Sequence, residues 1–113
     1  MNTFVESFNE LATDVHENAV QHGWWEKDRS DGELIALMHS ELSEALEALE
    51  ALRNGNPKDD KLPEFLNVEV ELGDVIIRIM DAAKERGWRV AEAVGAKAEY
   101  NKTRPFKHGG KEF

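Results

Sequence analysis

Residues 36–52, ALMHSELSEALEALEAL, decide the fold that this sequence predicts. With about 100° between successive residues, a helix over this stretch gathers its apolar side chains into one stripe. The stripe comprises Leu34, Leu37, Met38, Leu42, Ala45, Ala48, Leu49 and Leu52. Glu41 lies near the middle of the stripe, and Glu44 lies at its edge. A carboxylate on a packing face is costly unless it is protonated, paired or bound to a cation, so Glu41 requires a compensating group.

Outside this stretch the sequence predicts three more helices and no strand. Alanine, leucine, glutamate and lysine dominate the composition, and the prolines stand near expected helix ends. Capping-box patterns begin at Thr3 and at Ser30, whereas the third helix starts at Pro63 or has Asn67 as its cap. The expected helices cover residues 3–21, 31–53, 63–86 and 90–102. We therefore expect an all-α protein with a four-helix, bundle-like subunit.

Length and charge limit the function of the chain. Its 113 residues are expected to form one helical domain over residues 1–104, followed by a tail over residues 105–113. The formal net charge is −9 and lysine and arginine form no block, which argues against a nucleic-acid polymer as partner. The absence of cysteine excludes disulfides and thiolate metal sites. Because no apolar run is long enough to span a membrane and no signal-peptide pattern is present, we expect a cytoplasmic protein with no membrane partner.

Two of the expected helices each carry a pair of acids three residues apart. Glu41 and Glu44 form the first pair, and Glu71 and Asp74 form the second. This spacing puts both carboxylates of a pair on one helix face, and antiparallel packing of the two helices allows the pairs to meet. Four oxygen ligands without sulfur suit a hard cation, namely Mg²⁺ or, as a possible substitute, Mn²⁺. Gly73, in the middle of its helix, is expected to let a second helix or a ligand approach closely.

A single acid pair is commonplace on a solvated helix, and we interpret Glu47 and Glu50 in that way. Two pairs on consecutive helices, each beside an apolar face, favour a metal site. In this context ELSEALEAL (residues 41–49) and VEVELGDVIIRIMDAA (residues 68–83) resemble the MazG-like branch of the all-α nucleoside triphosphate pyrophosphohydrolases. The resemblance extends from the first helix to Arg104, and the spacer between the pairs is within the usual range of that family.

The resemblance implies a metal-dependent hydrolase. The two acid pairs would hold Mg²⁺ against the triphosphate of a nucleoside or deoxynucleoside triphosphate, and water would attack the α-phosphorus, giving the monophosphate and pyrophosphate. Glu41 or Glu44 is the candidate general base, and clearance of non-standard or surplus nucleotides is the expected role. The family also places basic and amide groups on a late helix. Lys97, Asn101 and Arg104 match that pattern and would bind phosphate, with a solvated helix end as the alternative.

Base recognition is expected upstream of the first acid pair. Trp24 and Trp25 are adjacent, so both cannot pack into one helix stripe, and at least one is expected to face a cleft or a partner chain. Related pyrophosphatases place a histidine and a tryptophan in this region. His16 and Trp25 match that placement better than His22 and Trp24 do. Packing between subunits is the alternative role for the tryptophans.

The expected third helix is apolar on two sides. Between its apolar faces runs a polar strip of Glu71, Asp74 and Arg78. Arg78 is expected to pair with one of the acids, and contact with phosphate is the alternative. A helix with two apolar faces is usually buried between others or at a subunit interface. Because a subunit of this size does not readily enclose a nucleotide, we expect a homodimer or a dimer of dimers (a homotetramer) with sites near the interface.

Three other functions compete with this interpretation. Sister activities of the same superfamily, phosphoribosyl-ATP pyrophosphatase or dUTPase, would share the metal site. A carboxylate-bridged di-iron bundle is disfavoured, because no histidine follows a candidate glutamate at the Glu-x-x-His spacing. A non-catalytic helical oligomer predicts that Glu71→Ala changes assembly and removes no hydrolytic activity.

Overall fold

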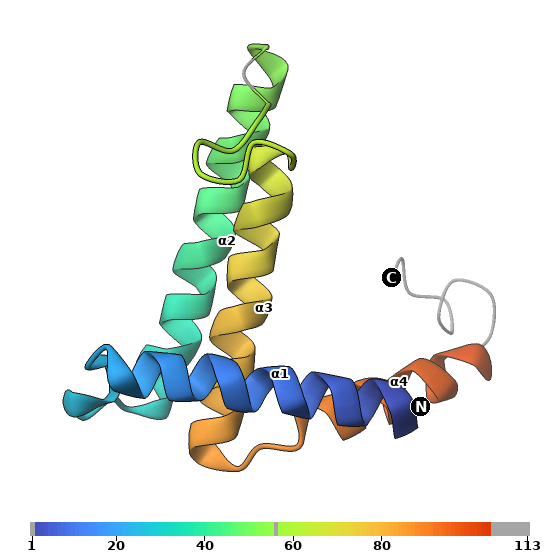
Figure 1. The fold of residues 1–113 in the computed structure, drawn as a ribbon. Coiled ribbons are helices and arrows are strands. Elements are labelled where there is room, and N and C mark those ends of the chain that lie inside the picture. Colours follow the sequence, from blue (N-terminus) through green and yellow to red (C-terminus); the bar gives the residue numbers. More distant parts are fainter. Residues whose placement is uncertain (1, 56, 105–113) are drawn as a thin grey trace.

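The computed structural model describes residues 2–55 and 57–104 (Figure 1). Its elements are α1 (Asn2–Gln21), the short 3-10 helix η1 (Trp24–Glu26), α2 (Asp31–Arg53), α3 (Asn67–Arg86) and α4 (Val90–Lys102). The described residues form no strand beyond an isolated bridge between Lys58 and Leu66, so the all-α expectation is confirmed. No helix in this described part is long and apolar enough to cross a bilayer. The expected tail, residues 105–113, lies outside the described residues.

Capping signals explain several helix ends. The Ser30 side-chain oxygen accepts a hydrogen bond from the N–H of Glu33 at 3.1 Å, which confirms the predicted start of α2. Gly87 ends α3 with a φ of 73°, a left-handed conformation that glycine adopts without steric cost. The pattern at Thr3 is different, because α1 already begins at Asn2 and Thr3 lies inside the helix.

Of the two starts predicted for α3, Pro63 is wrong by one helical turn, and Asn67 is within one residue of the observed start. The helix begins at Asn67 rather than at Pro63, and Asn67 is its first residue rather than its cap. Before it, residues 57–66 form a loop in which the Asp59 carboxylate accepts the N–H groups of Lys61 and Leu62 at 3.0 and 2.9 Å. These local bonds satisfy the backbone in a non-helical conformation, which outweighs the helix-start signal of proline.

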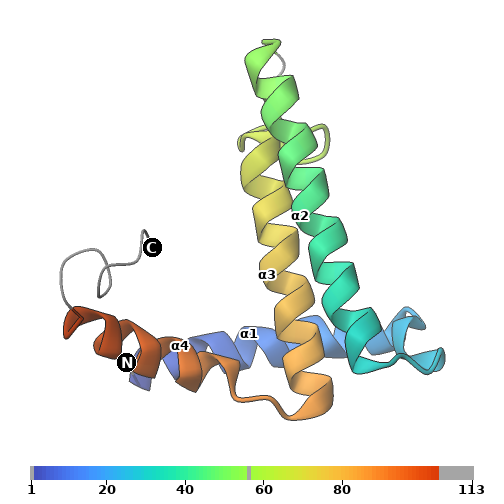
Figure 2. The ribbon, with the colours of Figure 1, turned by 180° about the vertical axis from the view of Figure 1, so that it is seen from behind.

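Helices α2 and α3 form an antiparallel pair, hereafter the hairpin, and α1 lies across its lower end (Figure 1). Helix α4 runs beside the N-terminal part of α1, away from the upper end of the hairpin, as the view from behind also shows (Figure 2). The Cα radius of gyration is 16.5 Å, whereas a compact domain of 100 residues has a value of about 13 Å. The single chain is therefore an open arrangement of helices.

Burial divides the predicted apolar stripe of α2 in two. Leu34, Ala45 and Ala48 are buried against α3, but Leu42 and Leu49 are exposed. By helical spacing, the exposed leucines of α2 lie on one side of the residues that face α3, and Glu44 lies on the other side. On α3, the exposed Leu72 and Ile76 likewise lie on the opposite side from Glu71 and Asp74. We call the exposed set the outer apolar face, and it comprises Ile35, Leu42, Leu46, Leu49, Leu72 and Ile76.

Candidate functional site

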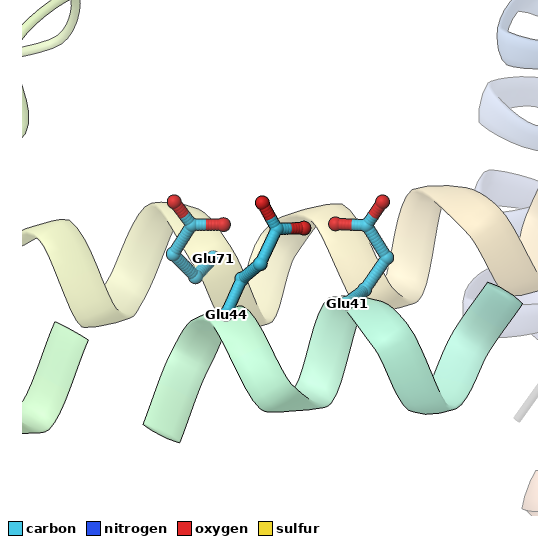
Figure 3. A group of neighbouring side chains, drawn as sticks. All are labelled: Glu41, Glu44 and Glu71. Carbon is cyan, nitrogen blue, oxygen red and sulfur yellow. The ribbon is translucent and has the colours of Figure 1, made fainter. Parts of the chain in front are cut away.

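The two predicted acid pairs converge on one side of the hairpin (Figure 3). Carboxylate oxygens of Glu41, Glu44 and Glu71, one from each side chain, all lie within 4.8 Å of one another. Two of these side chains come from α2 and the third comes from α3. Glu41 and Glu71 are half-buried and Glu44 is exposed, so a ligand can reach the cluster from solvent. Antiparallel packing thus brings together groups that are far apart in the sequence.

Asp74, the fourth predicted acid, lies beside this cluster rather than within it. It follows Glu71 by one turn of α3, is half-buried, and lines a cleft together with Glu41. Burial raises the pKa of its carboxyl, and the charge of Glu41 raises that pKa further, whereas Arg78 opposes the change. Asp74 therefore belongs to the same electrostatic unit as the three clustered acids.

Mutual repulsion perturbs the clustered acids. A hydrogen bond with the Glu41 carboxyl, followed by the charge of that group, raises the pKa of Glu44. Burial raises the pKa of Glu71, and the charges of Asp74 and Glu41 add to that effect. Closely spaced carboxylates disfavour their own ionisation, so this cluster gains stability from binding a proton or a cation.

Arg78 supplies part of the compensation that Glu41 requires. Its Nη2 donates to Glu41 Oε1 at 3.0 Å, and both side chains are largely withdrawn from solvent. The expected pairing of Arg78 with an acid is therefore confirmed. One guanidinium faces several acids, however, because Asp74 and Glu71 lie on the same strip of α3. The cluster thus retains excess negative charge.

A cleft of about 550 Å³ opens beside the acids, between the C-terminal end of α1, the turn into η1, α2 and α3. Its volume is within the range of small-molecule sites. The described residues that line it are Val15, Asn18, Ala19, His22, Gly23, Trp24, Arg29, Glu41, Asp74, Ile77, Arg78 and Asp81. The cleft therefore combines apolar wall, aromatic surface and charges of both signs.

Trp24 forms one wall of this cleft. The guanidinium carbons of Arg29 and Arg78 lie 3.8 and 4.1 Å from its ring centroid, so guanidinium groups already cover the indole. A role of Trp24 in base stacking stays a prediction. The Trp24 indole N–H is buried and has no hydrogen-bond partner among the described residues. Gly23 permits the turn that precedes it, with a φ of 84°, and a Cβ there would lie 2.8 Å from Glu26 Oε2.

Trp25 and His16 lie elsewhere, against α3. The Trp25 indole N–H donates to Asp81 Oδ1 at 2.9 Å, and His16 Nε2 lies 2.7 Å from Glu85 Oε1. These contacts tie α1 and η1 to the lower end of α3. Of the two histidine and tryptophan combinations considered from the sequence, Trp24 and His22 line the cleft, whereas Trp25 and His16 are not among its described lining residues. A role of His16 or Trp25 in base binding stays a prediction.

Helix α4 does not bring its basic face to the acids within one chain. Lys97 Nζ lies 4.8 Å from the Tyr100 ring centroid, and the Arg104 guanidinium lies 5.7 Å from it. Asn101 is exposed on the same helix. Because α4 packs beside α1 and away from the middle of the hairpin (Figures 1 and 2), these residues are remote from Glu41 in the single chain.

Two charged residues of the cleft, Arg29 and Asp81, were not identified from the sequence. Asp81 has an exposed fraction of 4% and continues the polar strip of α3, seven residues after Asp74. Helical spacing could have added it to that strip. No helical spacing identifies Arg29, because it lies in a turn. Its hydrogen bonds to Trp24 and Glu33 form only in the folded chain.

Gly73 was expected to allow close approach of a helix or a ligand. A Cβ built at Gly73 has no neighbouring atom within 4 Å in the described chain, so no helix approaches it there. It lines a second groove, of about 400 Å³, with Leu62, Phe65 and Ile77 among the other lining residues. A ligand or a second chain at this position stays a prediction.

Comparison of the chain with protein-family models, with curated proteins and with solved structures finds no match. The function proposed for this chain therefore rests on the acid cluster, the cleft beside it and the sequence motif that contains the acids.

Proposed function

We propose that the chain is a Mg²⁺-dependent nucleoside triphosphate pyrophosphohydrolase of the MazG-like type. The observation that carries this proposal is the convergence of three carboxylates from two helices at the edge of a cleft of small-molecule size. The spacing of the motif and the geometry of the cluster both favour a cation held between α2 and α3.

The donor set suits a hard divalent cation. Glu41, Glu44 and Glu71 would hold Mg²⁺, or Mn²⁺ in its place, with Asp74 beside them. All the ligands are oxygens, and the repulsion that raises the pKa of Glu44 and of Glu71 is relieved by positive charge. Bound Mg²⁺ neutralises charge on phosphate oxygens and lowers the pKa of water.

The side chains of the cleft supply the remaining functions. Arg78 and Arg29 place two guanidiniums near the acids of a chain with net negative charge, where they offset repulsion of a triphosphate. Glu44 or Glu41 accepts the proton of the attacking water, and a raised pKa suits Glu44 to that task. The water oxygen bonds to the α-phosphorus, the bond to the bridging oxygen breaks, and pyrophosphate leaves.

We further infer that the working protein is a homo-oligomer, either a dimer or a dimer of dimers. The outer apolar face exposes leucine and isoleucine side chains on both helices of the hairpin, including Leu46 at 67% and Ile76 at 50%. A contiguous apolar surface of this kind is typical of a protein contact. It lies on the side of the hairpin opposite the acids, so assembly through it leaves the cluster accessible.

A second copy that approaches from the acid side of the hairpin, through a contact other than the outer apolar face, is the proposed source of the late basic helix. Lys97, Asn101 and Arg104 retain their expected role in phosphate binding if they approach the acids of another chain. Mixing two inactive variants, Glu41→Gln and Lys97→Ala, then restores about a quarter of the wild-type activity, because half of randomly formed dimers are mixed and each holds one intact site. Unrestored activity in a mixture proven to exchange subunits contradicts the shared site.

Hydrolysis of a nucleotide panel tests the proposed reaction. The protein is incubated with Mg²⁺ and nucleoside triphosphates in ¹⁸O-labelled water, with dUTP and phosphoribosyl-ATP included for the sister activities. We expect pyrophosphate as a product and the label in the monophosphate. Release of inorganic phosphate, or label in pyrophosphate, contradicts attack at the α-phosphorus. Hydrolysis of no nucleotide contradicts the proposed function and favours a non-catalytic oligomer.

A further inference from the structure

Asp81 is the buried carboxyl at the end of the cleft farther from the acid cluster. Its exposed fraction is 4%, and its neighbours along α3 are Met80 and Ala82, both buried. Burial raises the pKa of this carboxyl, while the hydrogen bond from Trp25 and the charges of His16 and Arg78 act in the opposite direction. A carboxyl in such a position is costly unless its oxygens have partners. Trp25 supplies one, at Oδ1.

The other carboxylate oxygen of Asp81, Oδ2, does not take part in this hydrogen bond. Among the described residues, the hydrogen bond from Trp25 to Oδ1 is the one that Asp81 receives, and Oδ2 is not among the buried side-chain atoms without a partner, so it is open to the solvent of the cleft. Asp81 also lines the cleft. The cleft thus presents Asp81 Oδ2 as a hydrogen-bond acceptor, and the hydrogen bond from the Trp25 indole to Oδ1 fixes the orientation of the carboxylate. A ligand with an N–H group would donate to Oδ2.

The distance between Asp81 and the acid cluster along α3 determines which part of a bound nucleotide Asp81 would contact. Asp74, Arg78 and Asp81 follow one another at i, i+4 and i+7, so they lie along one face of α3. The rise of the helix separates the first from the last by about 10 Å. A nucleotide with its phosphates at the acid cluster therefore extends its base toward Asp81, past Trp24 and Arg78.

We propose that Asp81 determines base preference by accepting a hydrogen bond from the exocyclic amine of a nucleobase, and that Trp25 is the positioning residue that aims its carboxylate. This inference rests on the proposed function, because it assumes that the cleft holds the base of the substrate. The favoured substrates are nucleotides with an amino-substituted base, such as cytosine or adenine.

The chemistry of the base edges explains the preference. Cytosine and adenine present an amino group, a donor, where uracil, thymine and hypoxanthine present a carbonyl oxygen, an acceptor. An ionised carboxylate accepts hydrogen bonds and donates none. A carbonyl-bearing base would therefore place its own acceptor oxygen against the carboxylate oxygen, and no hydrogen bond would form between them. Sites that hydrogen-bond a substrate N–H reject the analogue that lacks it strongly.

Matched substrate pairs test this proposal. The pairs are dCTP with dUTP and ATP with ITP, whose members differ at the exocyclic group. For the wild type we expect kcat/KM to be at least about tenfold higher for the amino member of each pair. Asp81→Asn keeps the size of the side chain and offers both a donor and an acceptor, so the ratio falls toward one. Asp14→Asn, the same change at an exposed position of α1 outside the cleft, keeps the wild-type ratio. An equal or reversed wild-type ratio, or an unchanged ratio in Asp81→Asn, overturns the proposal.

Two further measurements separate this inference from its alternatives. Trp25→Phe removes the indole N–H but keeps an aromatic ring, and it lowers the ratio if Trp25 aims the carboxylate; a purely structural Asp81 would leave the ratio of a folded variant unchanged. Binding of dCMP and dUMP, followed by tryptophan fluorescence, needs no hydrolysis. Tighter binding of dCMP supports the role of Asp81 even if no triphosphate is hydrolysed, an outcome that overturns the proposed function alone. Equal binding of both nucleotides overturns the role of Asp81.

Discussion

The two ends of the hairpin are stabilised in different ways. At the lower end α1 and η1 cover α3, Leu34 and Met80 are buried, and the Asp31 carboxylate pairs with Arg86 at 2.8 Å. At the upper end α2 contacts α3 with no third helix across the pair (Figures 1 and 2), and Leu46 and Leu72 are exposed. The acid cluster lies at the level of these exposed leucines, on the other side of the hairpin.

This difference separates the end of the hairpin that one chain packs by itself from the end that is expected to depend on a cation or a second chain. The lower end has an apolar core within one chain, so it is expected to remain folded when ligands and partners are removed. The upper end has apolar side chains that the single chain leaves uncovered. A cation at the acids and a second chain on the outer apolar face would therefore change the upper end most.

Removal of divalent cations gives the largest expected effect. Chelation with EDTA lowers pyrophosphate release by at least about a thousandfold, because the cation contributes several kcal/mol to transition-state stabilisation. The near-ultraviolet circular dichroism of the tryptophans, which lie at the lower end, stays unchanged. Activity that survives exhaustive chelation contradicts the metal site, and loss of the tryptophan signal contradicts an independently folded lower end.

Leucine truncation compares the two ends directly. Leu34→Ala lowers the free energy of unfolding by about 2–5 kcal/mol, because its side chain is buried in the core. Leu46→Ala, measured at a concentration where the protein is monomeric, changes it by less than about 0.5 kcal/mol. Urea unfolding followed by circular dichroism gives both values. Similar losses for the two variants would show that the ends are equally packed.

A charged side chain on the outer apolar face tests self-association without changing the buried core of the chain. We expect Leu46→Asp to weaken self-association by at least about tenfold, because each interface loses a buried leucine and gains a carboxylate. Leu11→Asp, a control on the exposed surface of α1, leaves self-association unchanged. Sedimentation velocity over a concentration series measures the effect. Equal association of the two variants would place the interface elsewhere.

Acidification gives the smallest expected effect. The pKa values of Glu44, Glu71 and Asp74 are raised in the folded chain, so it binds more protons than the unfolded chain between the ordinary and the raised values. The contribution of this cluster to stability therefore increases as pH falls from neutral through the raised pKa values, and it levels off below about pH 4. In Glu44→Gln this gain in Tm is smaller than in the wild type, and saturating Mg²⁺ abolishes the difference. A larger gain in the variant contradicts the proposed repulsion.

Much of the fold was predictable, because helix signals in this sequence agree with one another. Apolar spacing and the cap at Ser30 located α2, and Gly87 located the end of α3. The sequence did not decide between Pro63 and Asn67 for the start of α3, because the loop before the helix is stabilised by the carboxylate of Asp59, which nothing in the spacing identifies. The acids could be found from the sequence, since their i, i+3 spacing is a local property of each helix.

The cleft could not be predicted from spacing. The resemblance favoured Trp25 and His16 for base binding, whereas Trp24 and His22 line the cleft, directly beside the left-handed turn at Gly23. Arg29 reaches the Trp24 ring from a turn, so its contribution depends on tertiary contacts. The position of α4 also depends on the path of the chain after Gly87, which helical periodicity does not specify.

The most direct measurement compares two charge-neutralising changes on the same helix. Pyrophosphate release is assayed with Mg²⁺ and a nucleoside triphosphate for the wild type, for Glu41→Gln in the cluster, and for Glu50→Gln, whose carboxylate pairs with Arg53 in solvent. If the cluster is the metal site, Glu41→Gln loses at least about a hundredfold in kcat/KM, and Glu50→Gln keeps the wild-type value. Equal activity of Glu41→Gln and the wild type would contradict the assignment of the site.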